Sequence, residues 1–335
     1  MGLQISEIVQ RKAIEFSELR GKIIAIDAFN VIYQFLSTIR QPDGTPLMDN
    51  KKRVTSHLSG LFYRNTNLLL EGLKMVYVFD GKPPEQKNVT HEKRQGDKDM
   101  ARERYNEAKE KKDVEGMGRY SRQLSELNDE MIEESKELLK AMGIAVVQAP
   151  GEGEAEASHL ARINKDIYGV GSQDYDSLLF GAPFLIQNLT LARKRKTASG
   201  YVEITPELIE LDKVLNHLQI NHEQLICLGI LVGTDYNPRG VLGIGPKKAL
   251  SLVKEKKIPS LIFKSVEEKI DFDWQEIFAL FKKPDVKDAK IEFPKVDKDK
   301  IKEILLKHDF SEQRIEKQFE KLDEIKKRAS QKTLF

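Results

Sequence analysis

The chain has 335 residues, 40% of them hydrophobic and 32% charged, so it can bury a large core beneath a strongly charged surface. The formal net charge of +2 is too small to mark the whole chain as a nucleic-acid binder, so any such surface must be local. The single cysteine, Cys227, excludes an internal disulfide. No apolar run approaches the ~20 residues of a membrane span, and the N-terminus is too polar for a secretory signal, so we expect a cytoplasmic protein.

Short apolar strands alternate with helices in the first part of the chain, and the strands end on acids. Asp27 closes the first strand, and Asp80 follows the second. The two strands are expected over residues 22–27 and 74–79, and two helices between them over residues 28–39 and 57–71. Strands that alternate with helices predict an α/β fold with a central, mainly parallel twisted sheet and helices on both faces.

A long and highly charged segment follows Asp80. It runs to residue 142, with a predicted helix over 124–139, and it holds several basic residues, namely Lys87, Lys93, Arg94, Lys98, Arg102 and Arg104. About sixty residues without a strand is long for a connection and is typical of a functional or mobile insertion. A solvated helical excursion with paired charges would have the same composition.

Two close carboxylate pairs, Glu152 with Glu154 and Asp174 with Asp176, flank a predicted helix and strand between residues 155 and 171. The second pair directly follows the strand, at the edge of an α/β sheet where ligands bind. Two charges ~5 Å apart at an effective dielectric of ~20 repel by roughly 3 kcal/mol, so such a cluster needs cations. Taken alone, the first pair is more typical of a helix N-terminus and the second of a turn than either is of a catalytic site.

Downstream of the acid pairs, two strands are expected around a basic run (residues 193–196) that is typical of a hairpin tip. Thr205 is expected to cap a helix, because proline follows it at the first helical position. Another helix, over residues 221–231, ends shortly before Asp235.

A glycine-rich stretch, here called the glycine hairpin (residues 239–249), precedes a further helix. Gly243 and Gly245 let the backbone approach a phosphate, while amides at the helix N-terminus and the side chains of Lys247 and Lys248 face the anion. The pattern predicts nonspecific binding to a DNA backbone. The alternative is a tight turn that carries surface lysines.

The chain has seven acids of interest, most of which lie directly after apolar strands or at helix starts, and none of which has a histidine partner. They are Asp27, Asp80, Glu152, Glu154, Asp174, Asp176 and Asp235. Oxygen-only ligands favour Mg²⁺ or Mn²⁺ over zinc, so the pattern predicts a two-cation site that hydrolyses a phosphodiester. Lys87 and Arg94 suit contacts to the scissile phosphate. Tyr33 either stacks on a base or forms the edge of the core.

The order of these motifs resembles the flap endonuclease family of structure-specific 5′ nucleases, in its archaeal form. The runs that carry the resemblance are IIAIDAFNVIYQFL, HLSGLFYRN, VYVFDGKPPEQK, APGEGEAEA, GSQDYDSLLFG and LVGTDYNPRGVLGIGPKKAL. The resemblance implies removal of 5′ flaps at duplex junctions, with 5′–3′ exonuclease activity, in Okazaki fragment maturation and long-patch base excision repair. It further implies that the seven acids hold two Mg²⁺ ions and that the charged insertion forms a helical arch through which the flap passes.

The resemblance also assigns DNA contacts and a domain plan. Gly2, Tyr33, Arg53 and the glycine hairpin would bind DNA, in this family often with K⁺ at the hairpin. Residues 1–330 would form one nuclease domain, followed by a clamp-binding tail. The domain would comprise an N-terminal nuclease region, the arch, an internal nuclease region and a helix-hairpin-helix-like C-terminal region, over residues 1–81, 82–135, 136–235 and 236–330.

The C-terminus begins, but does not complete, the family's clamp-binding box of a glutamine, an aliphatic residue and two aromatic residues. Gln331, Leu334 and Phe335 match that box, at the end of a polar tail that is expected to be disordered from Lys326. The expected partners are therefore branched DNA and the sliding clamp PCNA, bound by a monomer.

Three other functions fit parts of the pattern. A bubble- or junction-cutting nuclease of the same superfamily would use the same acids, although the compact insertion disfavours the repair-bubble type. A DNA-binding scaffold tethered to the clamp would carry purely structural acids. A metal-dependent phosphatase would need neither the hairpin nor the arch.

Overall fold

A seven-stranded sheet forms the centre of the computed structural model, which describes residues 3–41, 43–82, 88–111, 113–124, 126–190, 194–197 and 200–332. The strand order is β1-β9-β6-β5-β2-β3-β4, parallel from β6 to β4 and antiparallel where β9 joins β6 and β1. The strands are β1 (Lys12–Ala13), β2 (Ile23–Asp27), β3 (Lys74–Phe79), β4 (Ala145–Gln148), β5 (Ile167–Gly171), β6 (Phe184–Gln187) and β9 (Glu207–Glu210).

Successive residues of the central strands bury side chains on opposite faces of the sheet. On β3, Met75, Tyr77 and Phe79 belong to one hydrophobic core, and Val76 and Val78 belong to another. A strand with apolar residues on both faces must be covered on both sides, which is the usual setting of a parallel sheet. The predicted α/β class with a mainly parallel sheet is confirmed.

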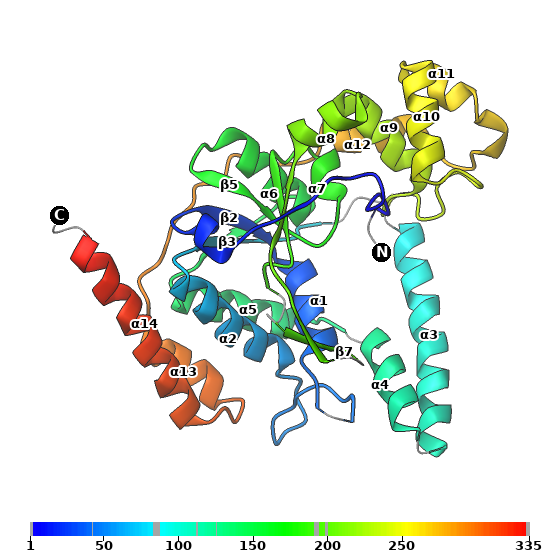
Figure 1. The fold of residues 1–335 in the computed structure, drawn as a ribbon. Helices are drawn as coiled ribbons and strands as arrows, with labels where there is room; N and C mark the ends of the chain where they lie inside the picture. The colour runs from blue at the N-terminus through cyan, green and yellow to red at the C-terminus, as the bar shows by residue number, and fades with distance from the viewer. Residues whose placement is uncertain are drawn as a thin grey trace.

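Helices cover both faces of this sheet (Figure 1). Helix α6 (Gly153–Ile163) and a non-helical connecting segment (residues 283–297) pack on the face of Val76 and Val78. The opposite face is covered by α1 (Ala28–Thr38), α2 (Ser56–Leu70), α5 (Asp129–Ala141), α13 (Lys298–Leu306) and α14 (Glu312–Lys332). The last two helices of the chain therefore complete a core that the first two begin.

A further hydrophobic core surrounds helix α9 (His222–Val232). Leu3 and Ile5 of the N-terminal segment contribute to it. The surrounding helices are α7 (Asp176–Leu179), α8 (Leu211–Leu218), α10 (Pro246–Lys256), α11 (Pro259–Lys264) and α12 (Trp274–Lys282). The glycine hairpin follows α9 and continues into the first turn of α10, so the predicted helix-hairpin-helix arrangement is present.

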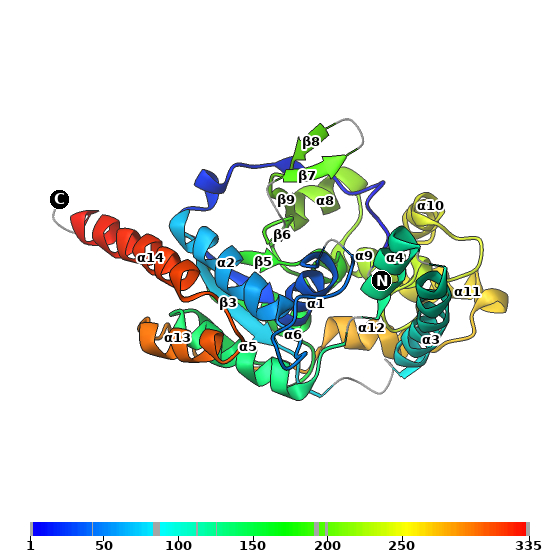
Figure 2. The same ribbon diagram turned by 90° about the horizontal axis from the view of Figure 1, so that it is seen from below.

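The charged insertion is helical, as predicted. Helices α3 (Asn88–Glu110) and α4 (Val114–Gln123) pack against each other at one side of the molecule (Figures 1 and 2). Arg40 Nη1 donates hydrogen bonds to Gly44 O and Ser121 Oγ, both at 2.9 Å. Because Ser121 lies on α4, these bonds tie the insertion to the loop between α1 and α2.

Two predicted helix starts were wrong. The helix expected from residue 124 begins at Asp129, because Asn128 caps it by accepting a hydrogen bond from Met131 N at 2.8 Å. Thr205 caps no helix: the residues after it form β9, and α8 starts only at Leu211. The pairing of β9 with β6 and β1 outweighs the local helix-start signal.

Two other segments also differ from the prediction. Residues 194–196 of the basic run lie in strand β7 (Lys194–Thr197), which pairs with β8 (Gly200–Glu203), and not at a hairpin tip, while Arg193 lies outside the described residues. Helix α14 continues to Lys332, past the point where the tail was expected to be disordered, because Lys, Arg, Ala and Gln are good helix formers. Among the described residues, none of the helices combines the length and the hydropathy of a membrane-spanning segment.

Candidate active site

The seven predicted acids come from the carboxyl ends of neighbouring strands and from the loop after α9. Strands β5, β2, β3 and β4 are adjacent, so the residues that follow them meet at one edge of the sheet. Asp27 ends β2, Asp80 follows β3, Glu152 and Glu154 follow β4, Asp174 and Asp176 follow β5, and Asp235 follows α9.

Asn30 connects the acids of β2 and β5. Its backbone N–H donates to Asp27 Oδ1 at 3.1 Å, because Asp27 caps helix α1. Its side-chain Nδ2 donates to Asp174 Oδ2 at 3.0 Å. A single residue in the first turn of α1 therefore orients two of the predicted acids.

Asp80 contacts the start of the helix that carries the glutamates. Gly153 N donates to Asp80 Oδ1 at 2.9 Å. A Cβ atom on Gly153 would lie 2.6 Å from that oxygen, so only glycine permits this approach. Gly153, between Glu152 and Glu154, is thus required because the Asp80 carboxylate approaches its backbone so closely.

Glu154 is held by the residue next to Asp176. The backbone N–H of Ser177 donates to Glu154 Oε1 at 3.0 Å, and the Ser177 hydroxyl donates to the same oxygen. Ser177 is fully buried. Because both donors come from α7, they join the glutamate helix to the loop of Asp174 and Asp176.

Glu152 is directed away from its own helix. It occupies the N-cap position of α6, but its side chain accepts no capping hydrogen bond there. The Tyr236 hydroxyl donates to Glu152 Oε2 instead. Since Tyr236 follows Asp235, this bond connects the last predicted acid to the others.

The electrostatics of the cluster follow from burial and from this convergence. Burial, together with repulsion from Asp176, Asp174 and Asp27, holds the pKa of the Glu154 carboxyl well above its usual range. Burial also raises the pKa of the Tyr236 hydroxyl, and the charge of Glu152 raises it further. Carboxylates that repel one another in a buried site favour a bound cation.

The donor set suits a hard divalent cation. All seven side chains offer carboxylate oxygens, the ligands that Mg²⁺ and Mn²⁺ prefer. Among the described residues, no three Asp, Glu, His or Cys side chains already have the spacing of a metal-ligand shell. Asp80, Glu152 and Glu154 are oriented by N–H and O–H donors of the protein.

Comparison with known proteins places this cluster in a family. An XPG N-terminal domain model matches residues 2–101, and an XPG I-region model matches residues 143–235. Flap endonuclease 1 of Hyperthermus butylicus is 50% identical over 330 residues, which cover 96% of this chain and 94% of the relative. Flap endonuclease 1 of Pyrococcus furiosus is 50% identical over 341 residues, which cover 100% and 98%. The chain belongs to the flap endonuclease 1 family.

Solved structures agree with this family assignment. Flap endonuclease-1 from Methanococcus jannaschii has a TM-score of 0.76 and 37% identity, over 97% of this chain and 98% of its own. The catalytic core of Rad2 in complex with a DNA substrate has a TM-score of 0.68 at 23% identity and shares the fold. The resemblance inferred from the sequence motifs is confirmed.

The predicted DNA-binding residues of this flap endonuclease lie outside the acid cluster. Tyr33 is 42% exposed on α1. Gly243 has a φ of +77°, Gly245 caps α10, and a Cβ on either glycine would meet nothing within 4 Å. Lys247 lies 3.5 Å from Glu7, and Lys248 Nζ donates to Gly243 O at 3.3 Å. The backbone at the hairpin tip is therefore open to a ligand.

Arg53 is already engaged within the protein. Its Nε pairs with Asp49 Oδ2 at 2.7 Å, and its Nη2 donates to Lys307 O at 2.7 Å. Gly2, Lys87, Leu334 and Phe335 lie outside the described residues. Arg94 and Gln331 fall within α3 and α14, but their side chains are also outside the described part of the chain.

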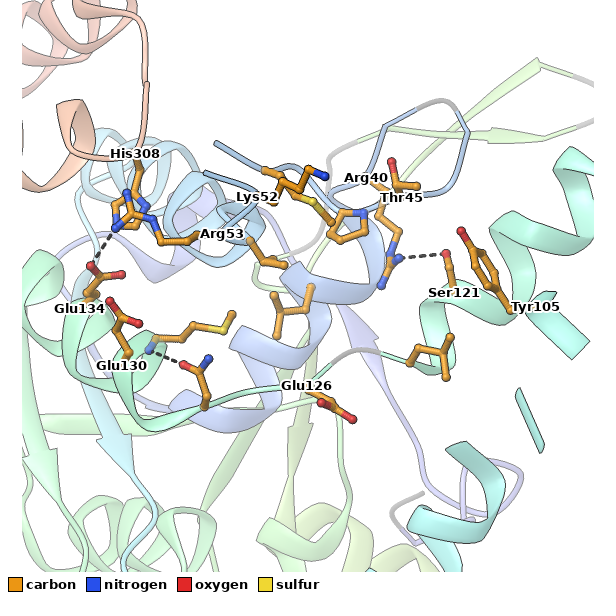
Figure 3. A pocket seen from close by; sticks show the side chains of 17 residues that line it. Arg40, Thr45, Lys52, Arg53, Tyr105, Ser121, Glu126, Glu130, Glu134 and His308 are labelled. Carbon is orange, nitrogen blue, oxygen red and sulfur yellow. Dashed lines mark hydrogen bonds and ion pairs between the residues drawn. The ribbon is translucent and has the colours of Figure 1, made fainter. Parts of the chain in front are cut away.

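Arg53 also lines a cavity of about 510 Å³ that is separate from the acid cluster (Figure 3). The cavity lies between the α1–α2 loop, α4, α5 and the turn after α13. Its polar lining residues include Arg40, Lys52, Glu126, Glu130, Glu134 and His308. None of the seven predicted acids lines it.

Three residues that orient the acids were missed by the sequence analysis: Asn30, Ser177 and Tyr236. Each is polar and each lies close in sequence to an acid, with Asn30 one helical turn after Asp27 and the other two directly after an aspartate. That spacing was the available signal for Asn30. The partners of Ser177 and Tyr236 lie elsewhere in the sequence, so spacing alone could not identify them.

Proposed function

We propose that this flap endonuclease owes its chemistry to the seven-acid cluster, which holds two divalent cations, Mg²⁺ or Mn²⁺. The supporting observation is that the Glu154 carboxyl is repelled by the charges of Asp176, Asp174 and Asp27, while hydrogen bonds from neighbouring residues orient Asp174, Asp80, Glu154 and Glu152. When bound, two such cations would activate a water molecule and stabilise the leaving oxygen of a phosphodiester. The chain would contribute the carboxylate oxygens that hold the cations.

The substrate we propose is DNA that carries a 5′ flap at a single-strand/duplex junction. The glycine hairpin would bind duplex phosphates through open backbone amides, Lys247 and Lys248, with K⁺ as a further ligand. Tyr33 would stack on the base beside the cut. Lys87 and Arg94, from the helical insertion, would neutralise the scissile phosphate.

The proposed cellular role is Okazaki fragment maturation and long-patch base excision repair, with accompanying 5′–3′ exonuclease activity. Residues 1–330 would act as one monomeric nuclease domain. The sequence from Gln331 to the C-terminus would contact the sliding clamp PCNA. The support for this contact is the partial match of Leu334 and Phe335 to the clamp-binding box.

The decisive experiment is cleavage of a labelled double-flap DNA with and without Mg²⁺. We expect cation-dependent release of the flap, and loss of cleavage in Asp174→Ala, which should still bind the DNA in Ca²⁺. Asp166→Ala is the control, because Asp166 is exposed just before β5, at the opposite end of that strand. Full cleavage by Asp174→Ala would refute the role of the acids.

The same assay separates the alternatives. Preferred cutting of a bubble or a four-way junction over a flap would assign the chain to another branch of the superfamily. A protein that binds flaps but releases no product under any divalent cation would be a scaffold. Inhibition of flap cleavage by a small phosphomonoester would favour a phosphatase.

A further inference from the structure

The hydrogen bond between Tyr236 and Glu152 belongs to no helix, strand or helix cap. Glu152 stands at the start of α6, where an acid often caps its own helix, yet its side chain makes no such bond. It accepts instead from a tyrosine that lies 84 residues further along the chain. Both residues are buried, at 7% exposure each.

The position of the tyrosine is set by its surroundings. Its ring packs edge-on against Phe281 of α12, with 5.2 Å between the ring centroids. Its backbone N–H donates to Thr234 Oγ1 at 3.2 Å. Asn237 fixes the same turn, accepting from Thr234 Oγ1 at 2.7 Å and donating to Ile230 O at 2.7 Å. The hydroxyl is thus presented to Glu152 by a rigid loop.

The hydroxyl can act here only as a donor. A phenol has a pKa of about 10, so at neutral pH it keeps its proton and donates it to the carboxylate, which can only accept. A hydrogen bond to a charged acceptor is stronger than a neutral one. It restrains the rotation of the Glu152 carboxylate, which the tyrosine meets on one oxygen.

We propose that Tyr236 is a positioning residue that fixes the Glu152 carboxylate and thereby sets the affinity of the acid cluster for divalent cations. The inference rests on the proposed function, because it presupposes that the cluster binds cations. Partners that orient metal ligands typically change metal affinity or activity by 10- to 100-fold when they are removed. The same loop carries Asp235, so the tyrosine orients one acid while its neighbour supplies another.

The test compares Tyr236→Phe with a matched control, Tyr175→Phe. Phenylalanine preserves the ring that packs on Phe281 and removes only the hydroxyl. Tyr175 is also a buried tyrosine, at 7% exposure, and it lies between two of the acids, but its hydroxyl bonds to Gln187. Both variants lose the hydroxyl of a buried tyrosine that is adjacent in sequence to a predicted acid, so a difference between them reports on the bond to Glu152.

Two measurements are needed, and one does not depend on catalysis. Mn²⁺ binding to the DNA-free full-length protein is measured by calorimetry, and flap cleavage is measured across a Mg²⁺ titration. For Tyr236→Phe we expect Mn²⁺ affinity to fall, and the half-saturating Mg²⁺ concentration to rise, by roughly 10-fold or more. Tyr175→Phe should stay within about 2-fold of the wild type on both measurements.

A double-mutant cycle identifies the partner. In a Glu152→Gln background, Tyr236→Phe should change Mn²⁺ affinity by less than about 2-fold, because the group on which it acts is gone. Equal shifts in both backgrounds would overturn the proposal. Wild-type cation dependence in Tyr236→Phe would also overturn the proposal. Loss of the cooperative unfolding transition in Tyr236→Phe would overturn it too, because the hydroxyl would then be needed for folding. A wild-type protein that binds no Mn²⁺ would instead refute the proposed function.

Discussion

Two clusters of buried carboxylates in this chain have opposite surroundings. At the turn after α13, Asp49 and Glu134 lie among cations: Arg53 Nε pairs with Asp49 at 2.7 Å, and Lys307 Nζ pairs with Glu134 at 2.8 Å. His308 joins the two, with Nδ1 3.2 Å from Asp49 and Nε2 2.9 Å from Glu134. We call Asp49, Arg53, Glu134, Lys307 and His308 the docking cluster, because they connect the turn after α13 to the α1–α2 loop and to α5.

The pKa shifts of the two clusters have opposite signs. Burial acts to raise the pKa of Asp49 and of Glu134, but hydrogen bonds from Arg53 to Asp49 and from Lys307 to Glu134 leave both pKa values below the usual range. In the acid cluster, burial and neighbouring carboxylates leave the pKa of Glu154 well above it. The chain supplies its own cations to Asp49 and Glu134, whereas in the acid cluster we propose that cations from solution offset the repulsion of Glu154.

The most direct way to break this comparison is to neutralise one acid of each cluster. Glu154→Gln should reduce single-turnover flap cleavage by ~10²- to 10³-fold, because it removes a cation ligand. It should also raise the unfolding free energy in EDTA at neutral pH, because a repelled carboxylate is removed. Glu134→Gln should do the reverse, with cleavage within about 3-fold of the wild type and lower stability. Equal destabilisation by both substitutions would contradict the distinction.

Removal of the histidine that joins the docking cluster should have a large effect on stability alone. His308→Ala removes a hydrogen-bond partner that Asp49 and Glu134 share, and we expect a loss of ~3–5 kcal/mol in unfolding free energy. Guanidinium unfolding monitored by circular dichroism would measure it. His217→Ala is the control, because that histidine is exposed and bonds only to Gln10 among its described contacts. A loss of less than about 1 kcal/mol would show that the cluster contributes little.

A buried histidine beside the docking cluster sharpens the comparison through pH. Burial lowers the pKa of His57 to about 4, and neither ring nitrogen has a hydrogen-bond partner among the described residues. An unfolded histidine titrates near ~6.5, so the unfolded chain takes up the proton first. Stability is therefore complete above pH ~6.5 and falls by up to about 3 kcal/mol as the pH drops toward 4. His57→Leu should flatten the stability profile in that pH window, and a profile that stays as steep as that of the wild type would contradict this prediction.

The smallest expected effect concerns two lysines of the glycine hairpin that we propose bind DNA. Lys247→Ala combined with Lys248→Ala should reduce the slope of log affinity against log salt concentration by about 2, without moving the cut. Lys254 and Lys256, at the other end of α10, provide the matched double-alanine control. Fluorescence anisotropy with a labelled flap substrate would measure the slope, over salt concentrations around ~0.1 M. An unchanged slope would count against the hairpin as a phosphate-binding site.

The sheet and its acids were predictable because their signals are local. Strand β3 has the predicted bounds, and the first helix differs from its prediction by one residue. Apolar strands that end on acids mark the carboxyl edge of a parallel sheet, so the meeting of Asp27, Asp80 and Asp174 followed from topology. The strand after Thr205 was missed because its partners, β6 and β1, lie elsewhere in the sequence.

The residues that orient the acids could not be predicted in the same way. Asn30 and Asp174 are 144 residues apart, and Tyr236 and Glu152 are 84 residues apart. Their hydrogen bonds depend on the conformation of the loops in the folded protein, which the hydrophobic periodicity of the sequence does not determine. The docking cluster was missed for the same reason, because it joins residues of the α1–α2 loop and α5 to the turn after α13.

Helix α14 has a consequence for how the chain is made. Ile315, Phe319 and Leu322 share a hydrophobic core with Leu58 and Phe62 of α2, and the two helices lie side by side (Figures 1 and 2). While the ribosome is still synthesising the chain, the apolar surface of α2 lacks its cover. A chain that ends before Glu312 would lack α14 and leave that apolar surface of α2 exposed and prone to aggregation. The core around α2 can therefore be completed only after the C-terminal helix has been synthesised.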